Sequence, residues 1–140
     1  MSNFHAAQFE WEGMEWHNSE AAYQSAKSLD VNVRRKFALM TCPVKAKRSG
    51  RNIKLRRDWD DVKVQIMTDI VWCKFDQNPN LQQLLLDTGE AYLSEGNTHG
   101  DNFWGACPVG NPKGKNMLGK VLMVVRKEGR NVWNKNGTPA

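Results

Sequence analysis

The stretch from Asp58 to Asp76 most constrains what this chain can fold into, because its apolar side chains recur at helical spacing. Val62, Ile66, Ile70 and Cys73 lie three or four residues apart, so they fall on one face of a helix. The pattern predicts the longest helix of the chain, with an apolar face that packs against other elements.

Signals for further helices stand on both sides of this stretch. Asn18 or Ser19 can cap a helix that runs to about Leu29. Pro43 and Pro79 each suit the first position of a helix, and Gly129 is expected to end the last one. The helices predicted from these signals cover residues 18–29, 30–40, 43–50, 78–89 and 116–127.

Extended structure is expected only in short pieces. Residues 9–16 alternate between apolar and polar around Glu12-Gly13, which predicts a hairpin with a two-residue turn. Residues 91–93 are predicted to form a short strand, and residues 96–115 a long loop of the kind that often carries function. We therefore predict a mainly α fold with a small β component (α+β), as a single domain of residues 1–129 followed by a polar tail of residues 130–140.

Composition and charge narrow the function classes. The chain has 140 residues, and its formal net charge of +5 favours a partner that carries phosphate. The three cysteines form no CxxC pair and the three histidines show no ligand spacing, so neither disulfides nor a metal site are expected. No apolar stretch approaches about 18 residues and no secretory signal is readable, so we expect a protein of the reducing cytoplasm without membrane contact.

The first predicted helix carries a row of polar side chains. Glu20 and Lys27 lie about two helical turns apart, with Tyr23 and Gln24 between them on nearly the same face. Most charged side chains on helices are solvated, so one interpretation is an exposed stripe. The other is the wall of a cleft, in which a desolvated amine beside a carboxylate acts as a nucleophile.

Two other segments are candidates for ligand contacts. Residues 45–57 hold the densest positive run, which is either a solvated surface or a cradle for a pyrophosphate or a nucleic-acid backbone. In residues 101–105, Trp104 either fills the core or stacks a base, and Gly105 would let a ligand approach the backbone. Residues 114–116 precede a helix whose free N–H groups can hold an anion, but the spacing is not that of a nucleotide-binding P-loop.

These segments also carry motifs that occur together in one known family. The motifs are Ser2-Asn3-Phe4, Ser19-Glu20-Ala21-Ala22-Tyr23-Gln24-Ser25-Ala26-Lys27, Ala46-Lys47 with Gly50-Arg51, Leu55-Arg56-Arg57-Asp58-Trp59, Lys74-Phe75 with Gln77-Asn78-Pro79-Asn80-Leu81, Leu85 with Thr88-Gly89, Asp101-Asn102-Phe103-Trp104-Gly105, Gly114-Lys115-Asn116-Met117-Leu118-Gly119, and Leu122-Met123 with Arg126. The ordered set, from about residue 2 to residue 127, resembles the NADAR family of N-glycosidases.

This resemblance implies a mostly helical hydrolase that cleaves a ribosyl C1–N bond without a metal or another cofactor. It implies two substrate classes. One is ADP-ribosylated guanine, in nucleic acid or as a nucleotide, and the other is a phosphorylated ribosyl intermediate of riboflavin biosynthesis. We expect the first. The sequence departs from the family at Ala21, where family members often have His, and in residues 105–116, whose pattern is its own.

The resemblance also suggests roles for single residues. Lys27 is the expected nucleophile, forming a Schiff base with the opened ribose, and Glu20 and Asp101 are the expected carboxylates, which stabilise the developing positive charge of the sugar or assist the leaving base. The expected substrate contacts are Asn3, Phe4, Tyr23, Gln24, Arg51, Arg56, Trp59, Trp104, Gly105 and Asn116. Two alternative functions are not enzymatic: a nucleic-acid-binding module without catalytic activity, and an inactive relative that only senses ADP-ribose.

Overall fold

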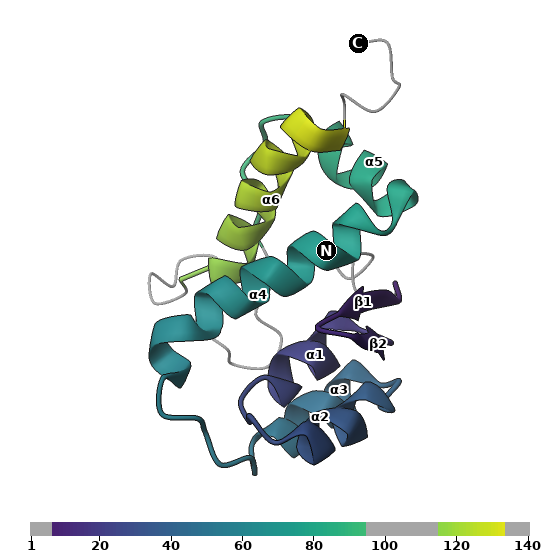
Figure 1. Cartoon of the computed structure of the whole chain (residues 1–140). Coiled ribbons are helices and arrows are strands. Elements are labelled where there is room, and N and C mark those ends of the chain that lie inside the picture. The colour runs from purple at the N-terminus through teal and green to yellow at the C-terminus, as the bar shows by residue number, and fades with distance from the viewer. Residues whose placement is uncertain (1–6, 95–114, 134–140) are drawn as a thin grey trace. The chain divides into compact units, whose positions relative to one another are not determined.

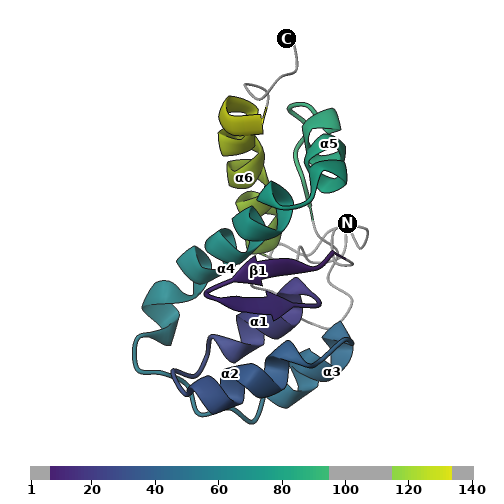
Figure 2. The same cartoon turned by 45° about the vertical axis from the view of Figure 1, so that its right-hand side comes forward.

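The computed structural model describes residues 7–94 and 115–133 and divides the chain into two compact units (Figures 1 and 2). The first unit comprises residues 2–78 and the second comprises residues 79–140. The described residues are mostly helical, and the strands among them form one hairpin. This confirms the predicted fold class. No helix within the described ranges is long and apolar enough to cross a membrane.

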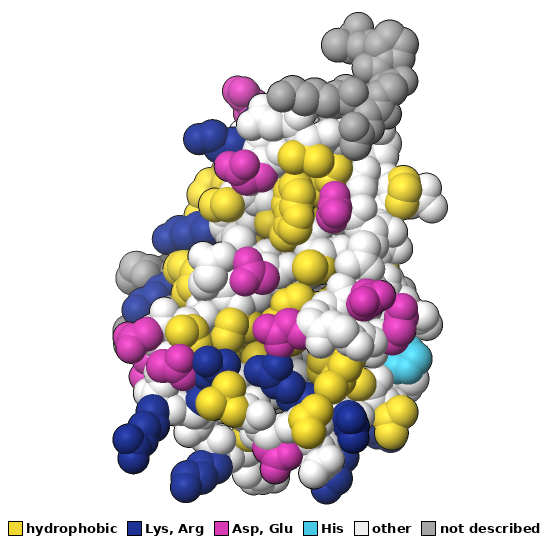
Figure 3. All heavy atoms as spheres, viewed as in Figure 1, with side chains coloured by type: hydrophobic (Ala, Val, Ile, Leu, Met, Phe, Trp, Pro, Cys, Tyr) yellow, Lys and Arg dark blue, Asp and Glu magenta, His cyan; other side chains and the backbone are white. Residues whose placement is uncertain are grey.

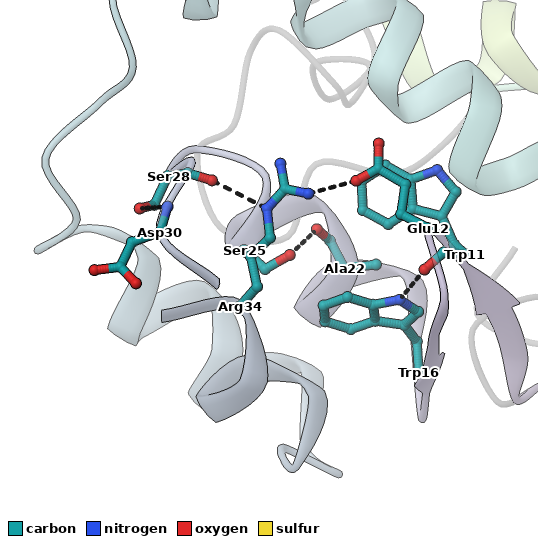
Figure 4. Close-up of polar contacts among 8 residues, drawn as sticks. All are labelled: Trp11, Glu12, Trp16, Ala22, Ser25, Ser28, Asp30 and Arg34. Atoms are coloured by element: carbon teal, nitrogen blue, oxygen red, sulfur yellow. Dashed lines mark hydrogen bonds and ion pairs between the residues drawn. The ribbon is translucent and has the colours of Figure 1, made fainter. Parts of the chain in front are cut away.

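The first unit begins with the predicted hairpin. Strands β1 (Phe9–Trp11) and β2 (Met14–Trp16) pair antiparallel, with Phe9 opposite Trp16 and Trp11 opposite Met14. Glu12 and Gly13 both have positive φ angles, of 50° and 77°, as a turn of the I′ kind requires. The hairpin buries Phe9, Trp11 and Trp16, and the Trp16 ring nitrogen donates to the Trp11 carbonyl at 3.0 Å (Figure 4).

Four helices complete the first unit. They are α1 (Ser19–Ser25), α2 (Val31–Ala38), α3 (Pro43–Gly50) and α4 (Trp59–Asp76). Helix α1 contacts α2, α3, α4 and β2, so it lies at the centre of the unit (Figure 1). Ala21, Ala22 and Ala26 are fully buried, and their small side chains let the neighbouring elements approach α1 closely.

Helix α1 ends earlier than predicted, at Ser25 rather than near Leu29, so that prediction was wrong. The N–H groups of Lys27 and Ser28 reach back only three residues, to Gln24 and Ser25, in a tighter turn. The Ser28 hydroxyl then accepts from the Asp30 N–H at 3.0 Å, and the Ser28 carbonyl accepts from the Arg34 side chain (Figure 4). These contacts redirect the chain toward α2 and leave the Leu29 side chain 71% exposed.

The second unit pairs helix α5 (Pro79–Asp87) with helix α6 (Met117–Trp133). Buried leucines and valines of both helices, among them Leu85 and Val125, form its core. Residues 91–93, predicted as a strand, contain no strand, because the Leu93 carbonyl accepts from the side-chain amide of Asn116 rather than from a partner strand.

Helix α6 runs past Gly129, contrary to the prediction that this glycine ends it. The buried Trp133 ring packs directly over Gly129, where an added Cβ would lie 2.3 Å from the ring. The glycine therefore makes room for a tryptophan one turn later instead of ending the helix. Residues 130–133 accordingly belong to the helix and not to the polar tail that was predicted to begin at residue 130.

Candidate functional site

The start of α1 is fixed by a buried asparagine. The Asn18 side chain accepts from the Ala21 N–H at 2.8 Å, which caps the helix, and its amide donates to the Met40 carbonyl at 3.1 Å. Asn18 is 2% exposed, so its bond with Ala21 is shielded from water and its bond with Met40 is partly shielded. One residue therefore holds the first turn of α1, which carries Glu20, against the segment that follows α2.

The polar row of α1 faces inward. Gln24 is only 5% exposed, and Glu20 and Lys27 are half-buried, so the interpretation as a solvated stripe is wrong for this face. The Gln24 amide nitrogen donates to a Glu20 carboxylate oxygen at 3.2 Å. A carboxylate and an amide thus share a hydrogen bond on the predicted cleft side of α1.

Gly50, the last residue of α3, meets this row and was not among the predicted site residues. The Lys27 ammonium nitrogen donates to the Gly50 carbonyl at 3.3 Å. The Gln24 side chain packs so closely on Gly50 that an added Cβ would lie 1.9 Å from the Gln24 amide oxygen. That oxygen is buried and has no hydrogen-bond partner among the residues described.

The turn that carries Lys27 is held from two further directions. The backbone N–H of Arg56 donates to the Lys27 carbonyl at 2.8 Å, which links the segment after α3 to this turn. The Arg34 side chain donates to the Ser28 carbonyl at 3.1 Å, pairs with Glu12 and lies over the Trp11 ring (Figure 4). The Lys27 backbone is therefore held by elements on both sides, which limits the positions open to its amine.

Tyr23 and Trp59 were predicted to contact substrate, and the structure places them in the core. Their rings pack against each other with centroids 5.1 Å apart and planes tilted by 52°, and both are buried. This contact joins α1 to α4. Both rings therefore have a packing role, and their contact with substrate stays a prediction.

The two arginines predicted to meet phosphates have different surroundings. Arg51 is exposed, whereas the half-buried Arg56 makes a two-point ion pair with Asp58, at 2.6 and 3.0 Å. The hydrogen bond to Asp58 raises the pKa of Arg56, and the same bond lowers the pKa of the Asp58 carboxyl. The pairing of Arg56 with a carboxylate was not predicted from the sequence.

Positive charge is concentrated in residues 31–57, which span α2, α3 and the segment after α3. This range contains half of the chain's twenty Lys and Arg residues and none of its fifteen Asp and Glu residues. Figure 3 shows such side chains gathered in the lower part of the view, where α2 and α3 lie in Figure 1. A surface of this kind attracts anions, phosphates included.

Asn116 has a structural role within the second unit. It is 4% exposed, has a positive φ of 50°, and donates to the Leu93 carbonyl at 2.8 Å and to the Tyr92 hydroxyl at 3.2 Å. A Cβ on Gly119 would collide with both the Leu93 carbonyl and the Asn116 amide. These contacts explain why a glycine stands three residues after Asn116. Contact of Asn116 with substrate stays a prediction.

The other predicted site residues lie outside the described residues. They are Asn3, Phe4, Asp101, Trp104 and Gly105. Within residues 7–94 and 115–133, no three His, Cys, Asp or Glu side chains are grouped so that they could hold a metal ion. The described part of the candidate site is therefore the Glu20–Gln24–Lys27 row with Gly50.

Comparison with known proteins decides which family these features belong to. The model of the NADAR domain matches residues 1–130. The chain belongs to the NADAR family. N-glycosidase YbiA of Escherichia coli strain K12 is 39% identical over 129 residues, which cover 91% of this chain and 79% of that protein. An N-glycosidase of Nostoc punctiforme is 40% identical over 127 residues, which cover 87% of this chain and 80% of that protein.

A solved structure extends this similarity to the fold. The NMR structure of E. coli YbiA superposes with a TM-score of 0.81 at 36% identity, covering 99% of this chain and 81% of that one. The predicted family is thus confirmed. So is the prediction of an enzyme: this NADAR protein is a hydrolase that acts on N-glycosyl bonds.

Proposed function

We propose that this NADAR protein removes ADP-ribose from ADP-ribosylated guanine, in nucleic acid or as a nucleotide, by cleaving the ribosyl C1–N bond. The observation that carries the proposal is the inward row of α1 and the turn after it, in which an amide and an amine meet the end of α3 and the amide also binds a carboxylate. Glu20 and Lys27 are half-buried, the Gln24 amide donates to Glu20, and the Lys27 amine donates to Gly50.

Lys27 acts as the nucleophile in the proposed reaction. Its unprotonated amine attacks C1 of the ribose, and the bond from C1 to the guanine nitrogen breaks. The ribose ring then opens at its C1–O bond, and that oxygen takes the proton that the Lys27 nitrogen loses, which leaves an imine between Lys27 and C1. The guanine leaves with the electron pair and takes a proton from an acid, for which Glu20 and Asp101 are the candidates. Water then cleaves the resulting imine, which restores the amine and releases ADP-ribose.

Phosphate recognition is assigned to the positive segment of the first unit. Arg51 is exposed and follows α3 directly, so it can reach an anion near Gly50. Arg56 keeps guanidinium N–H groups beyond the two that bind Asp58, because a guanidinium has five N–H donors. Substrate contacts by Asn3, Phe4, Trp104, Gly105 and Asn116 stay predictions of this proposal.

The test is release of ADP-ribose from an oligonucleotide that carries ADP-ribosylated guanine. Lys27→Ala should abolish release while the circular dichroism spectrum stays native, and Glu20→Gln should slow it by about 100-fold or more. Lys63→Ala is the matched control, since Lys63 lies on α4 and pairs with Asp60 there. Near-normal release by Lys27→Ala, or a loss below about threefold in Glu20→Gln, would remove that residue from the chemistry.

Phosphorylated intermediates of riboflavin biosynthesis are the second candidate substrates. A riboflavin biosynthesis protein of Vibrio vulnificus is 38% identical over 130 residues, although this chain spans only 35% of that protein. Both substrates carry phosphate and a ribosyl C1–N bond, so the α1 row could serve either. Assays of the wild-type enzyme and the same variants on both substrates distinguish the two candidates, because the wild-type enzyme should show a much larger kcat/KM on its true substrate.

A non-catalytic nucleic-acid-binding role predicts a different result. Binding would then weaken steeply as the salt concentration rises, because phosphate contacts are electrostatic, and Lys27→Ala would change neither binding nor any product.

The proposed location is a reducing cytoplasm, since Cys42 and Cys73 are free thiols.

A further inference from the structure

Gln24, which was predicted to contact substrate, lies between Glu20 and Gly50 in the first unit. The side chain is almost fully buried and packs on the backbone of Gly50, at the end of α3. Its amide nitrogen points to Glu20, and its amide oxygen lies at Gly50 with no hydrogen-bond partner in the described part of the chain. A buried acceptor without a partner costs about 1–3 kcal/mol, so an apolar residue here would favour folding.

The orientation of the Gln24 amide follows from charge. If the amide were flipped, its oxygen would face the Glu20 carboxylate, and two negative oxygen atoms would repel each other. The donor therefore faces Glu20, and the oxygen is left against Gly50, whose missing side chain makes room for it. The same glycine supplies the carbonyl that accepts from the Lys27 amine.

We propose that Gln24 and Gly50 form a positioning pair, which sets the Glu20 carboxylate and the Lys27 amine in a fixed relation to each other. Gln24 is a positioning residue and not a substrate contact. Gly50 acts twice, because its carbonyl orients Lys27 and its lack of a Cβ admits Gln24. The inference rests on the proposed function only in that Glu20 and Lys27 carry the chemistry.

Gln24→Met is the deciding variant, because methionine fills a similar volume without a donor or an acceptor. A positioning role predicts that kcat falls about tenfold or more while KM changes little, since a misplaced reacting group costs rate. The melting temperature should stay equal or rise, because the unpartnered oxygen is gone. A residue that only supports the fold would instead lose stability and activity together.

Gln65→Met is the matched control. The Gln65 amide donates to Asp69 at 2.8 Å, again four residues away, but on the exposed side of α4. This variant removes the same kind of hydrogen bond at a distance from the α1 row. It should leave kcat and KM within about twofold of wild type, since exposed pairs of this kind contribute little.

Gly50→Ala tests the other half of the pair. The added Cβ displaces the Gln24 amide, so both the melting temperature and kcat should fall. Truncating the glutamine in the double variant Gln24→Ala/Gly50→Ala should restore the melting temperature but leave kcat no higher than in Gln24→Ala. Full recovery of kcat in the double variant would overturn the inference, since it would show that Gln24 does nothing beyond fitting the space.

A measurement without substrate separates this inference from the proposed function. The carboxyl carbon resonance of Glu20 in a NMR spectrum reports its hydrogen bond, and it should shift in Gln24→Met but not in Gln65→Met. If it shifts and no substrate is cleaved by wild type, the proposed function fails and the positioning contact stands. If Lys27→Ala is inactive while Gln24→Met keeps wild-type kcat and an unshifted resonance, the proposed function stands and the positioning pair is refuted.

Discussion

Removing the cap of α1 should destabilise the first unit more than removing the cap of α2. Asn18→Ala deletes the acceptor for the Ala21 N–H, which costs about 1 kcal/mol for a typical helix cap. It also deletes the donor to the Met40 carbonyl, which adds about 0.5–1.5 kcal/mol for a hydrogen bond. We therefore expect a loss of about 2 kcal/mol, a large fraction of the stability of an ordinary domain.

Asp30→Ala is the control, because Asp30 caps α2 through a single hydrogen bond, to the Asn32 N–H at 2.8 Å, and is exposed. Its loss should cost about 1 kcal/mol. Urea unfolding followed by tryptophan fluorescence reports the first unit, which contains four of the six tryptophans. Equal midpoint shifts for Asn18→Ala and Asp30→Ala would refute the claim that Asn18 ties α1 to the segment after α2.

Three further predictions concern other parts of the chain. Gly129→Ala should lower the free energy of unfolding by about 1–2 kcal/mol, because the new Cβ meets the tryptophan ring one turn later, and an unchanged melting temperature would contradict that contact. Iodoacetamide at neutral pH should label Cys42 faster than Cys73, as peptide mass spectrometry can show. Backbone N–H groups lower the pKa of Cys42, burial raises that of Cys73, and equal rates would be the contrary result. Asp58→Asn should lower the melting temperature at pH 7. Arg56 lowers the pKa of Asp58 in the folded state, so the ion pair stabilises the fold above the unfolded pKa of 3.8, and this stabilisation is lost as the pH falls below that value. The difference in melting temperature from wild type should therefore vanish in acid. A difference that stays constant with pH would argue against the ion pair.

Local signals predicted most helices because each depends on residues close in sequence. The apolar spacing from Asp58 to Asp76 and the positions of Pro43 and Pro79 located three helices to within about two residues. The predictions failed where a distant contact decides. Helix α1 ends early because Arg34 holds the Ser28 carbonyl, and α6 continues because a ring packs on Gly129.

The candidate site was partly readable for the same reason. Helical spacing placed Glu20 and Gln24 together, since that relation is local to one helix, whereas Lys27 lies in the turn that follows α1. Gly50 was missed, because its contact with Lys27 spans 23 residues of sequence and uses a backbone carbonyl, which no side-chain pattern reveals. A glycine inside a family motif was the only signal that could have drawn attention to it.

Reductive trapping tests the central claim most directly. The full chain is incubated with ADP-ribose and borohydride, which reduces an imine to a stable amine, and the digested protein is analysed by mass spectrometry. The proposed chemistry predicts one ADP-ribosyl adduct on Lys27, absent from Lys27→Ala and undiminished in Lys63→Ala. Adducts scattered over surface lysines with Lys27 unmodified, in an enzyme that still cleaves its substrate, would contradict it.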